Sequence, residues 1–177
     1  MTIWTLRHPS VDRKGRCIGQ TPVEMTAPID DSVRKVIQSA PFVPSRLFSS
    51  DLPRCAQLAE GLAQHWGVYL EMTASLREMN FGEWEGRSYD EIDSSDAERW
   101  RTWCADWRHE RPPGGESIDD LVERVSNWLQ THSPSSSDLL VTHAGVIRVF
   151  RVLGGESWEE AMAAQCPFLG WMKHRYR

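Results

Sequence analysis

Short apolar runs alternate along this chain with segments in which apolar residues recur every three or four positions. The apolar runs predict strands, because runs of this length without strict alternation are typical of strands covered on both faces. These strands are expected at 3–7, 46–50, 68–70 and 138–142. The spaced residues predict helices at about 30–40, 52–66, 94–110, 117–130 and 146–153. Weaker patterns indicate a further helix at 158–164 and an edge strand at 168–176.

Strands that alternate with helices predict an α/β fold, a three-layer sandwich with a mostly parallel central sheet flanked by helices. The 177 residues fit one domain spanning 1–177. Within it, the turn-rich stretch and tryptophan-bearing helix at 79–116 are expected to form a small cap. The glycine pairs match neither a dinucleotide-binding nor a Walker motif, which argues against a nucleotide fold.

The chain has an acidic balance and no obvious targeting segment. Its formal net charge of −5 lacks the basic footprint of a nucleic-acid-binding protein. No apolar run approaches the roughly 20 residues of a membrane span, and no basic segment precedes an apolar one at the N-terminus. The four cysteines form no CxxC pair and are read as reduced thiols. We therefore expect a cytoplasmic protein with neither a nucleic-acid nor a membrane partner.

Basic and imidazole side chains follow the predicted strands where these end. Arg7 and His8 follow the first strand, and His143 follows the fourth. Arg54 lies in the first turn of the helix after the second strand. The carboxyl ends of parallel strands share one edge of a sheet, so these side chains are expected to converge. Such a cluster in an acidic protein favours the binding of an anion. The paired N–H donors of arginine fit the oxygens of a tetrahedral phosphoryl group.

Four short motifs resemble those of the histidine phosphatase superfamily, in its phosphoglycerate mutase-like branch. They are Leu6-Arg7-His8, Ser49-Ser50-Asp51-Leu52-Pro53-Arg54-Cys55, Leu76-Arg77-Glu78-Met79-Asn80-Phe81-Gly82-Glu83-Trp84-Glu85-Gly86 and Val141-Thr142-His143-Ala144-Gly145. They occur in the order of that family and extend over nearly the whole chain.

The resemblance implies a role for each member of the cluster. His8 would be the nucleophile that is phosphorylated, and Glu78 would protonate the leaving oxygen. The phosphoryl oxygens would be bound by Arg7, Arg54 and His143, with Ala144 beside them. Neither a metal nor another cofactor is implied, because the arginines would balance the charge of the transferring group.

Pro9 departs from the family pattern, which has glycine after the histidine. Proline loses the backbone N–H but keeps the carbonyl, which can accept a hydrogen bond from the second ring nitrogen of His8. The asparagine of the family's following loop has no clear counterpart here, and Gln20 and Thr21 are expected to line the pocket instead.

Two further features have competing interpretations. Glu83 and Glu85 lie close to Glu78 in sequence and are interpreted as carboxylates that stabilise the loop. The stripe of Trp100, Trp103 and Trp107 is typical of core packing, and an aromatic wall at a substrate entrance is the alternative.

The short cap favours hydrolysis, because mutases of this superfamily carry long insertions over the site. Further motifs are similar to those of the alpha-ribazole phosphatases within the superfamily, at 17–23, 79–87, 112–117 and 141–148. The partner would be a small phosphate monoester, alpha-ribazole 5′-phosphate or adenosylcobalamin 5′-phosphate of cobalamin biosynthesis. The alternatives are a broad-specificity or sugar-phosphate histidine phosphatase, a phosphoglycerate mutase, a non-catalytic phosphate-binding module and a metal-dependent hydrolase. The oligomeric state is left open, a homodimer included.

Overall fold

The computed structural model describes residues 1–176, and its centre is a five-stranded sheet in the order β3-β2-β4-β1-β5. The strands are β1 (Thr2–Arg7), β2 (Arg46–Ser50), β3 (Tyr69–Thr73), β4 (Asp138–Thr142) and β5 (Trp171–Arg175). All neighbouring pairs are parallel except β1 and β5, which run antiparallel at one edge. The predicted mostly parallel α/β sheet is confirmed, with β5 as its edge strand.

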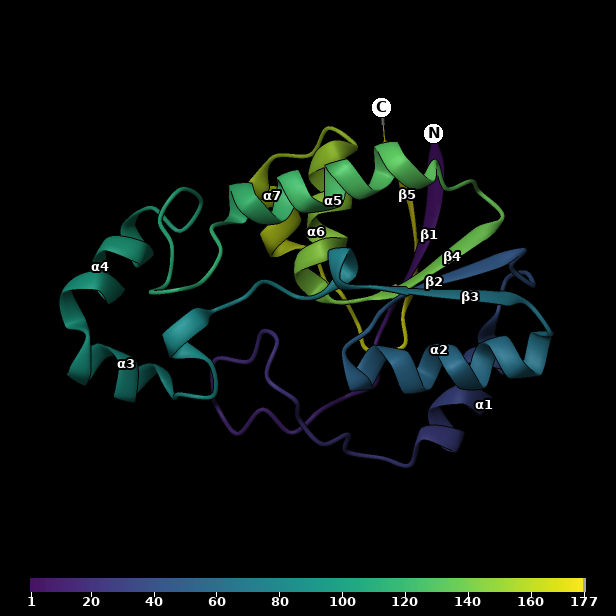
Figure 1. Cartoon of the computed structure of the whole chain (residues 1–177), viewed down its shortest axis with the longest axis horizontal. Coiled ribbons are helices and arrows are strands. Elements are labelled where there is room, and N and C mark those ends of the chain that lie inside the picture. Colours follow the sequence, from purple (N-terminus) through teal and green to yellow (C-terminus); the bar gives the residue numbers. More distant parts are fainter. Residues whose placement is uncertain (177) are drawn as a thin grey trace.

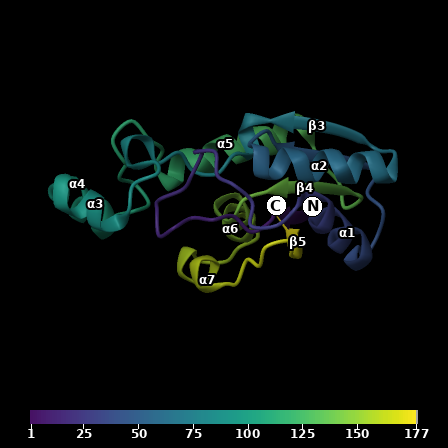
Figure 2. The ribbon, with the colours of Figure 1, turned by 90° about the horizontal axis from the view of Figure 1, so that it is seen from below.

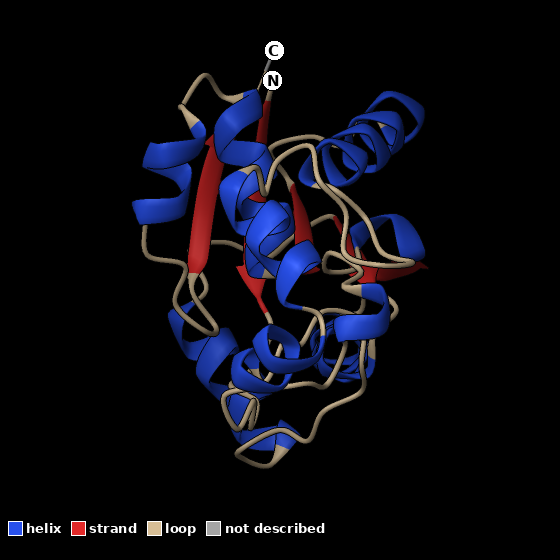
Figure 3. Ribbon diagram, turned by 90° about the vertical axis from the view of Figure 1, so that its left-hand side faces the viewer, coloured by secondary structure: helices blue, strands red, loops and turns tan. Residues whose placement is uncertain are grey.

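Helices cover both faces of the sheet and complete the predicted three layers (Figure 1). On one face lie α1 (Ile29–Ser39) and α2 (Pro53–Trp66). On the other lie α5 (Ile118–His132), α6 (Ala144–Leu153) and α7 (Trp158–Ala163). Figure 3 views the same arrangement from the end that carries the remaining two helices. No helix within residues 1–176 is long and apolar enough to cross a membrane.

The central position of β4 in the sheet explains why Leu139, Leu140 and Val141 form an uninterrupted apolar run. Leu139 and Val141 pack into the core beneath α1 and α2, whereas Leu140 packs into the core beneath α5 and α6. Every residue of β4 is buried, because successive side chains point to opposite faces and both faces are covered. The strand therefore delivers whatever follows Thr142 to a buried position at the carboxyl edge of the sheet.

The segment 79–116 projects from one end of the sheet as a separate lobe, as two views agree (Figures 1 and 2). The prediction of one helix over 94–110 is wrong, because the structure has two shorter helices, α3 (Tyr89–Ser95) and α4 (Ala97–Ala105). The break is at Asp96, whose carboxylate accepts a hydrogen bond from the indole of Trp84 at 2.9 Å and another from Arg99 at 2.8 Å. Trp107 follows α4 in a turn.

Candidate active site

The carboxyl edge of the sheet brings the predicted catalytic residues together. Arg7 ends β1 opposite Thr142 of β4, and the residues that follow, His8 and His143, are therefore neighbours. Their ring centroids lie 5.0 Å apart. Arg54 lies in the first turn of α2, the helix that follows the neighbouring strand β2, and its side chain reaches His143. Convergence of these side chains follows directly from the parallel sheet.

His8 is held rigidly in one tautomer. It is 4% exposed, and its backbone N–H donates to the carbonyl of Thr142 at 3.0 Å. Its Nδ1 lies 2.7 Å from the carbonyl oxygen of Pro9. Because a carbonyl only accepts, Nδ1 carries the proton and Nε2 keeps a free lone pair. The contact expected of the Pro9 carbonyl is confirmed.

The environment of His8 keeps its ring uncharged. Burial lowers its pKa to about 3, and the nearby positive charges of Arg54 and Arg7 act in the same direction. The hydrogen bond to Pro9 opposes this shift without cancelling it. His8 is therefore a neutral imidazole at neutral pH, the form that can act as a nucleophile.

His143 is fully buried, and both its ring nitrogens have protein partners. Nε of Arg54 donates to Nδ1 at 3.3 Å, so Nε2 carries the proton and donates to Oγ of Ser50 at 2.8 Å. Burial, with the nearby His8 and Arg54, holds the pKa of His143 well below its usual range. This geometry makes His143 a neutral support for Arg54, and its predicted direct contact with phosphate stays a prediction.

Arg54 carries a buried positive charge without a carboxylate partner among residues 1–176. It is 3% exposed, and its terminal nitrogens donate to the backbone carbonyls of Gly19 and Thr21. Burial lowers its pKa, which reflects the cost of keeping this charge away from water. An unneutralised buried guanidinium of this kind favours an anion beside it.

Arg7 is fixed by the segment that precedes β5. Its guanidinium carbon lies 3.9 Å from the ring centroid of Phe168, and Nη1 donates to the carbonyl of Cys166. Its Nε is buried without a hydrogen-bond partner within residues 1–176. The Phe168 ring also packs against His8, at 5.5 Å between centroids. The sequence reasoning missed Phe168, since an aromatic residue before an edge strand carries no signal of a site.

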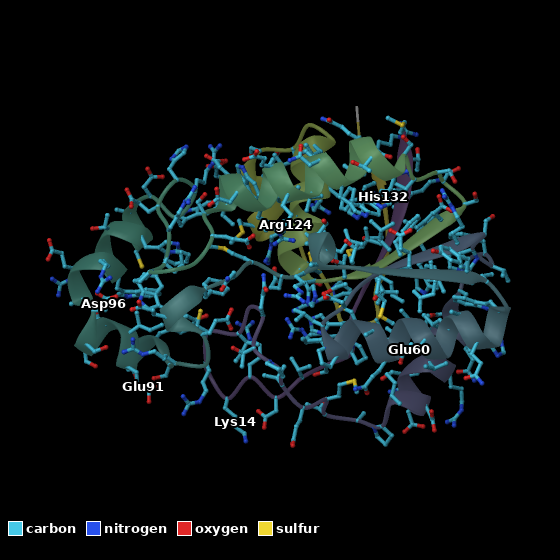
Figure 4. All side chains as sticks on the ribbon, viewed as in Figure 1. Lys14, Glu60, Glu91, Asp96, Arg124 and His132 are labelled. Atoms are coloured by element: carbon cyan, nitrogen blue, oxygen red, sulfur yellow. The ribbon has the colours of Figure 1, made fainter. Side chains whose placement is uncertain are left out.

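Glu78 is anchored at the beginning of α6. Its two carboxylate oxygens accept from the backbone N–H of Gly145 at 3.1 and 3.2 Å. A Cβ atom at position 145 would lie 2.1 Å from Oε1 of Glu78, which explains the glycine. Arg124, labelled on α5 in Figure 4, donates to the carbonyls of Arg77 and Glu78, at 3.1 and 3.4 Å. Glu78 thus faces the site from outside the sheet.

Glu85 organises the loop that carries Gln20 and Thr21. Its carboxylate accepts from the backbone N–H groups of Gly19, Gln20 and Thr21, at 2.7 to 3.1 Å, and from the Thr21 hydroxyl. Burial alone would raise the pKa of Glu85, but these hydrogen bonds outweigh it and the pKa is lowered. The interpretation of Glu85 as a loop-stabilising carboxylate is confirmed.

The side chains of Gln20 and Thr21 do not line the cavity that adjoins this cluster. Gln20 donates to the carbonyl of Glu78 at 3.1 Å, and the Thr21 hydroxyl faces Glu85. The structure thus places both around the active site without putting either on the cavity wall. Their observed contribution is to shape the loop whose carbonyls hold Arg54.

A cavity of about 540 Å³ adjoins the cluster and is reached by Arg7, Glu78 and Ala144. Its apolar wall comes from the lobe and from the helices on one face of the sheet: Met79, Phe81, Trp103, Trp107, Ile118, Leu121, Trp158 and Met162.

The tryptophan stripe serves both interpretations. Trp103 and Trp107 line the cavity, whereas Trp100 stacks on Trp103 at 5.5 Å and on Tyr89 at 5.7 Å within the lobe.

The geometry as a whole can bind a tetrahedral anion between two arginines, beside a neutral imidazole and a carboxylate. No cluster of three or more potential metal ligands occurs within residues 1–176.

Comparison with known proteins agrees with this geometry. The sequence pattern of the histidine phosphatase superfamily (branch 1) matches residues 3–169. The adenosylcobalamin/alpha-ribazole phosphatase of Salmonella typhimurium is 28% identical over 155 residues, which cover 83% of this chain and 76% of that protein. A probable phosphoglycerate mutase, GpmB, of Salmonella paratyphi C is 30% identical over 169 residues, covering 90% of this chain and 78% of that protein.

The fold has a close counterpart among solved structures. The alpha-ribazole phosphatase from Shigella flexneri superimposes with a TM-score of 0.85 over 98% of this chain and 89% of that chain. The two sequences are 24% identical, so this likeness concerns the fold.

The lowered pKa values of His8 and His143 predict rings that stay neutral through the physiological range. In nitrogen-detected NMR of labelled protein, neither ring should titrate between pH 5 and 8, and His8 should appear as the Nδ1–H tautomer. Both rings have a lower pKa in the folded protein than the ordinary value of about 6.5. Below about pH 6.5 the unfolded chain therefore binds more protons than the folded protein, and the free energy of unfolding should fall as the pH drops. Titration of His8 near pH 6.5 would contradict the proposed environment.

Proposed function

The chain belongs to branch 1 of the histidine phosphatase superfamily, and from that premise we propose that it hydrolyses phosphate monoesters through a phosphohistidine formed on His8. The observation that carries the proposal is the neutral His8 ring, with its Nε2 lone pair free, beside the buried Arg54. A neutral imidazole can attack phosphorus, and the arginines balance the charge of the phosphoryl oxygens.

The reaction divides into two displacements. In the first, Nε2 of His8 bonds to phosphorus, the ester P–O bond breaks, and Glu78 gives its proton to the departing alkoxide. In the second, the Glu78 carboxylate takes a proton from water, the resulting oxygen bonds to phosphorus, and the P–N bond breaks. Inorganic phosphate leaves, and His8 and Glu78 return to their starting states. Through both steps Nδ1 keeps its proton and donates it in a hydrogen bond to the Pro9 carbonyl oxygen, which stabilises the positive charge of the phosphorylated ring.

Arg54 and Arg7 hold the transferring group from two sides. Arg54 is oriented by His143 and by the carbonyls of the loop at 19–21, and Arg7 by Phe168 and the carbonyl of Cys166. Because neither guanidinium has a carboxylate partner within residues 1–176, both charges remain available to phosphate. This preorganisation is the electrostatic contribution that lowers the barrier.

For the substrate we propose alpha-ribazole 5′-phosphate or adenosylcobalamin 5′-phosphate. The name of the Salmonella typhimurium relative supports this choice. So does the cavity wall, since Phe81, Trp103 and Trp107 offer a stacking surface to a flat base. Phosphoglycerate mutase activity is the second candidate, favoured by the 30% identity to the probable mutase. The rates at which the purified protein converts alpha-ribazole phosphate, sugar phosphates and phosphoglycerates distinguish these substrate assignments.

The His8→Ala variant tests the mechanism. It should lose essentially all turnover of p-nitrophenyl phosphate, because His143, the other imidazole of the cluster, has both ring nitrogens engaged, while the wild type keeps full activity in excess EDTA. Steady-state rates of purified proteins check both expectations. Wild-type turnover in His8→Ala would overturn the mechanism, and loss of wild-type activity in EDTA would point to a metal-dependent hydrolase.

The role of Glu78 predicts a dependence on the leaving group. Glu78→Gln should lower kcat for an alkyl phosphate by about 100-fold or more, the usual contribution of general acid catalysis. Its effect on p-nitrophenyl phosphate should be much smaller in the phosphorylation step, because p-nitrophenolate leaves without protonation. Single-turnover rates measure that step alone. Glu83→Gln, at an exposed carboxylate of the same loop, is the matched control and should leave both rates unchanged. Equal losses on both substrates in Glu78→Gln would exclude the proton-donor role.

The aromatic wall predicts substrate-specific effects. Trp103→Leu or Trp107→Leu should raise KM for alpha-ribazole 5′-phosphate by about 2- to 10-fold more than KM for p-nitrophenyl phosphate, the range expected of one aromatic contact. Trp66→Leu removes an indole away from the cavity and should not change the ratio. Parallel changes in both KM values would mean that the wall does not recognise the base.

A further inference from the structure

The cavity beside the active site holds more positive charge than one phosphoryl group explains. Its lining includes Arg7, Arg13 and Arg148, with Glu78 as the single carboxylate. Arg54, outside this lining, adds another buried positive charge close to His8. The chain as a whole has a net charge of −5, so this excess is local and not a consequence of composition.

Arg148 reaches the cavity from the helix that also holds Glu78 in place. It follows Ala144 and Gly145 by one turn of α6, and residues at this spacing share a helix face. All three line the cavity. Arg148 is half-buried, and its Nε is inaccessible and without a hydrogen-bond partner. Within residues 1–176, its guanidinium makes no hydrogen bond, ion pair or cation–π contact.

Arg13 supplies a second free charge from the loop after His8. Its side chain is exposed and has no side-chain partner within residues 1–176. It is close enough to the site for its charge to contribute to lowering the pKa of both Arg7 and His8. The other arginines of the site have defined supports, in the carbonyls and rings that hold Arg7 and Arg54. Arg13 and Arg148 therefore remain available once a phosphoryl group has taken Arg7 and Arg54.

We propose that Arg148, assisted by Arg13, binds a second oxyanionic group carried by the leaving-group side of the substrate. The proposal rests on the phosphomonoesterase function above and narrows its substrate class, since alpha-ribazole 5′-phosphate has no second anionic group and would leave Arg148 unpaired. A half-buried guanidinium that lacks any partner is costly, and a bidentate oxyanion removes that cost. Because Trp103, Trp107 and Trp158 line the same cavity, the substrate class is a phosphate monoester whose alcohol bears a flat apolar ring and a second anionic group.

Matched aryl phosphates test this subsite. The probes are 3- and 4-carboxyphenyl phosphate, each paired with its carbamoyl analogue, which has nearly the same shape but no charge. The corresponding sulfophenyl phosphates tell a tetrahedral oxyanion from a planar one. We expect wild-type kcat/KM to favour at least one anionic probe over its carbamoyl analogue by about tenfold or more, and this preference should shrink with added salt because it is electrostatic.

The variant Arg148→Met keeps an unbranched apolar side chain and removes the charge. It should cut the preference for the anionic probe by about tenfold, and Arg13→Met should cut it by a smaller factor. Arg101→Met makes the same change at an exposed arginine of α4 outside the cavity lining and should leave the preference intact. Circular dichroism melts of each variant check that it is folded.

Two results would overturn the subsite. The first is a wild type that hydrolyses every anionic probe no better than its carbamoyl analogue. The second is a preference that Arg148→Met leaves unchanged. Failure of the underlying function would look different, because the wild type would then hydrolyse none of the probes, p-nitrophenyl phosphate included.

Discussion

The hydrogen bond between Nδ1 of His8 and the carbonyl oxygen of Pro9 is the contact on which the chemistry of this site depends. At 2.7 Å it fixes which ring nitrogen carries the proton, and it leaves the other as the sole nucleophilic position. The sheet provides the second constraint, because β1 and β4 run parallel in a register that sets His8 beside His143. Proline at position 9 is compatible with this design, since only a carbonyl is needed there. A residue that ends a strand thus also orients the ring that we propose as the nucleophile.

Two supports outside the sheet keep positive charge at this edge. Glu85 organises the loop at 19–21, the carbonyls of that loop hold Arg54, and His143 accepts from the same guanidinium. On the other side, the segment before β5 holds Arg7 through Phe168 and the carbonyl of Cys166. Neither arginine is neutralised by a carboxylate within residues 1–176, although burial makes each charge costly. That cost is the physical reason to expect an anion at the site, and it is independent of which alcohol a phosphate would be attached to.

Much of this arrangement could be predicted from sequence, because it depends on local pattern and on a general property of parallel sheets. Apolar runs that end in Arg7-His8 and in His143 are enough to place those side chains at one edge. The rest depends on contacts between distant segments, which no spacing reveals. Phe168 lies 160 positions beyond His8, and Gln20 and Thr21 turn toward Glu85 and Glu78 instead of the cavity. The tryptophan stripe looked like part of one long helix, but α4 begins only after the break at Asp96 and ends at Ala105, so that Trp107 lies beyond it.

The central claim is that Nε2 of His8 is the atom that receives the phosphoryl group. The most direct test is phosphorus and nitrogen NMR of the enzyme trapped with a fast phosphate ester and quenched in base, where phosphohistidine survives. The account predicts phosphate on His8 and attached to Nε2, with no signal from the Nδ1 isomer. Phosphate on Nδ1 of His8, or on any other residue, would contradict it.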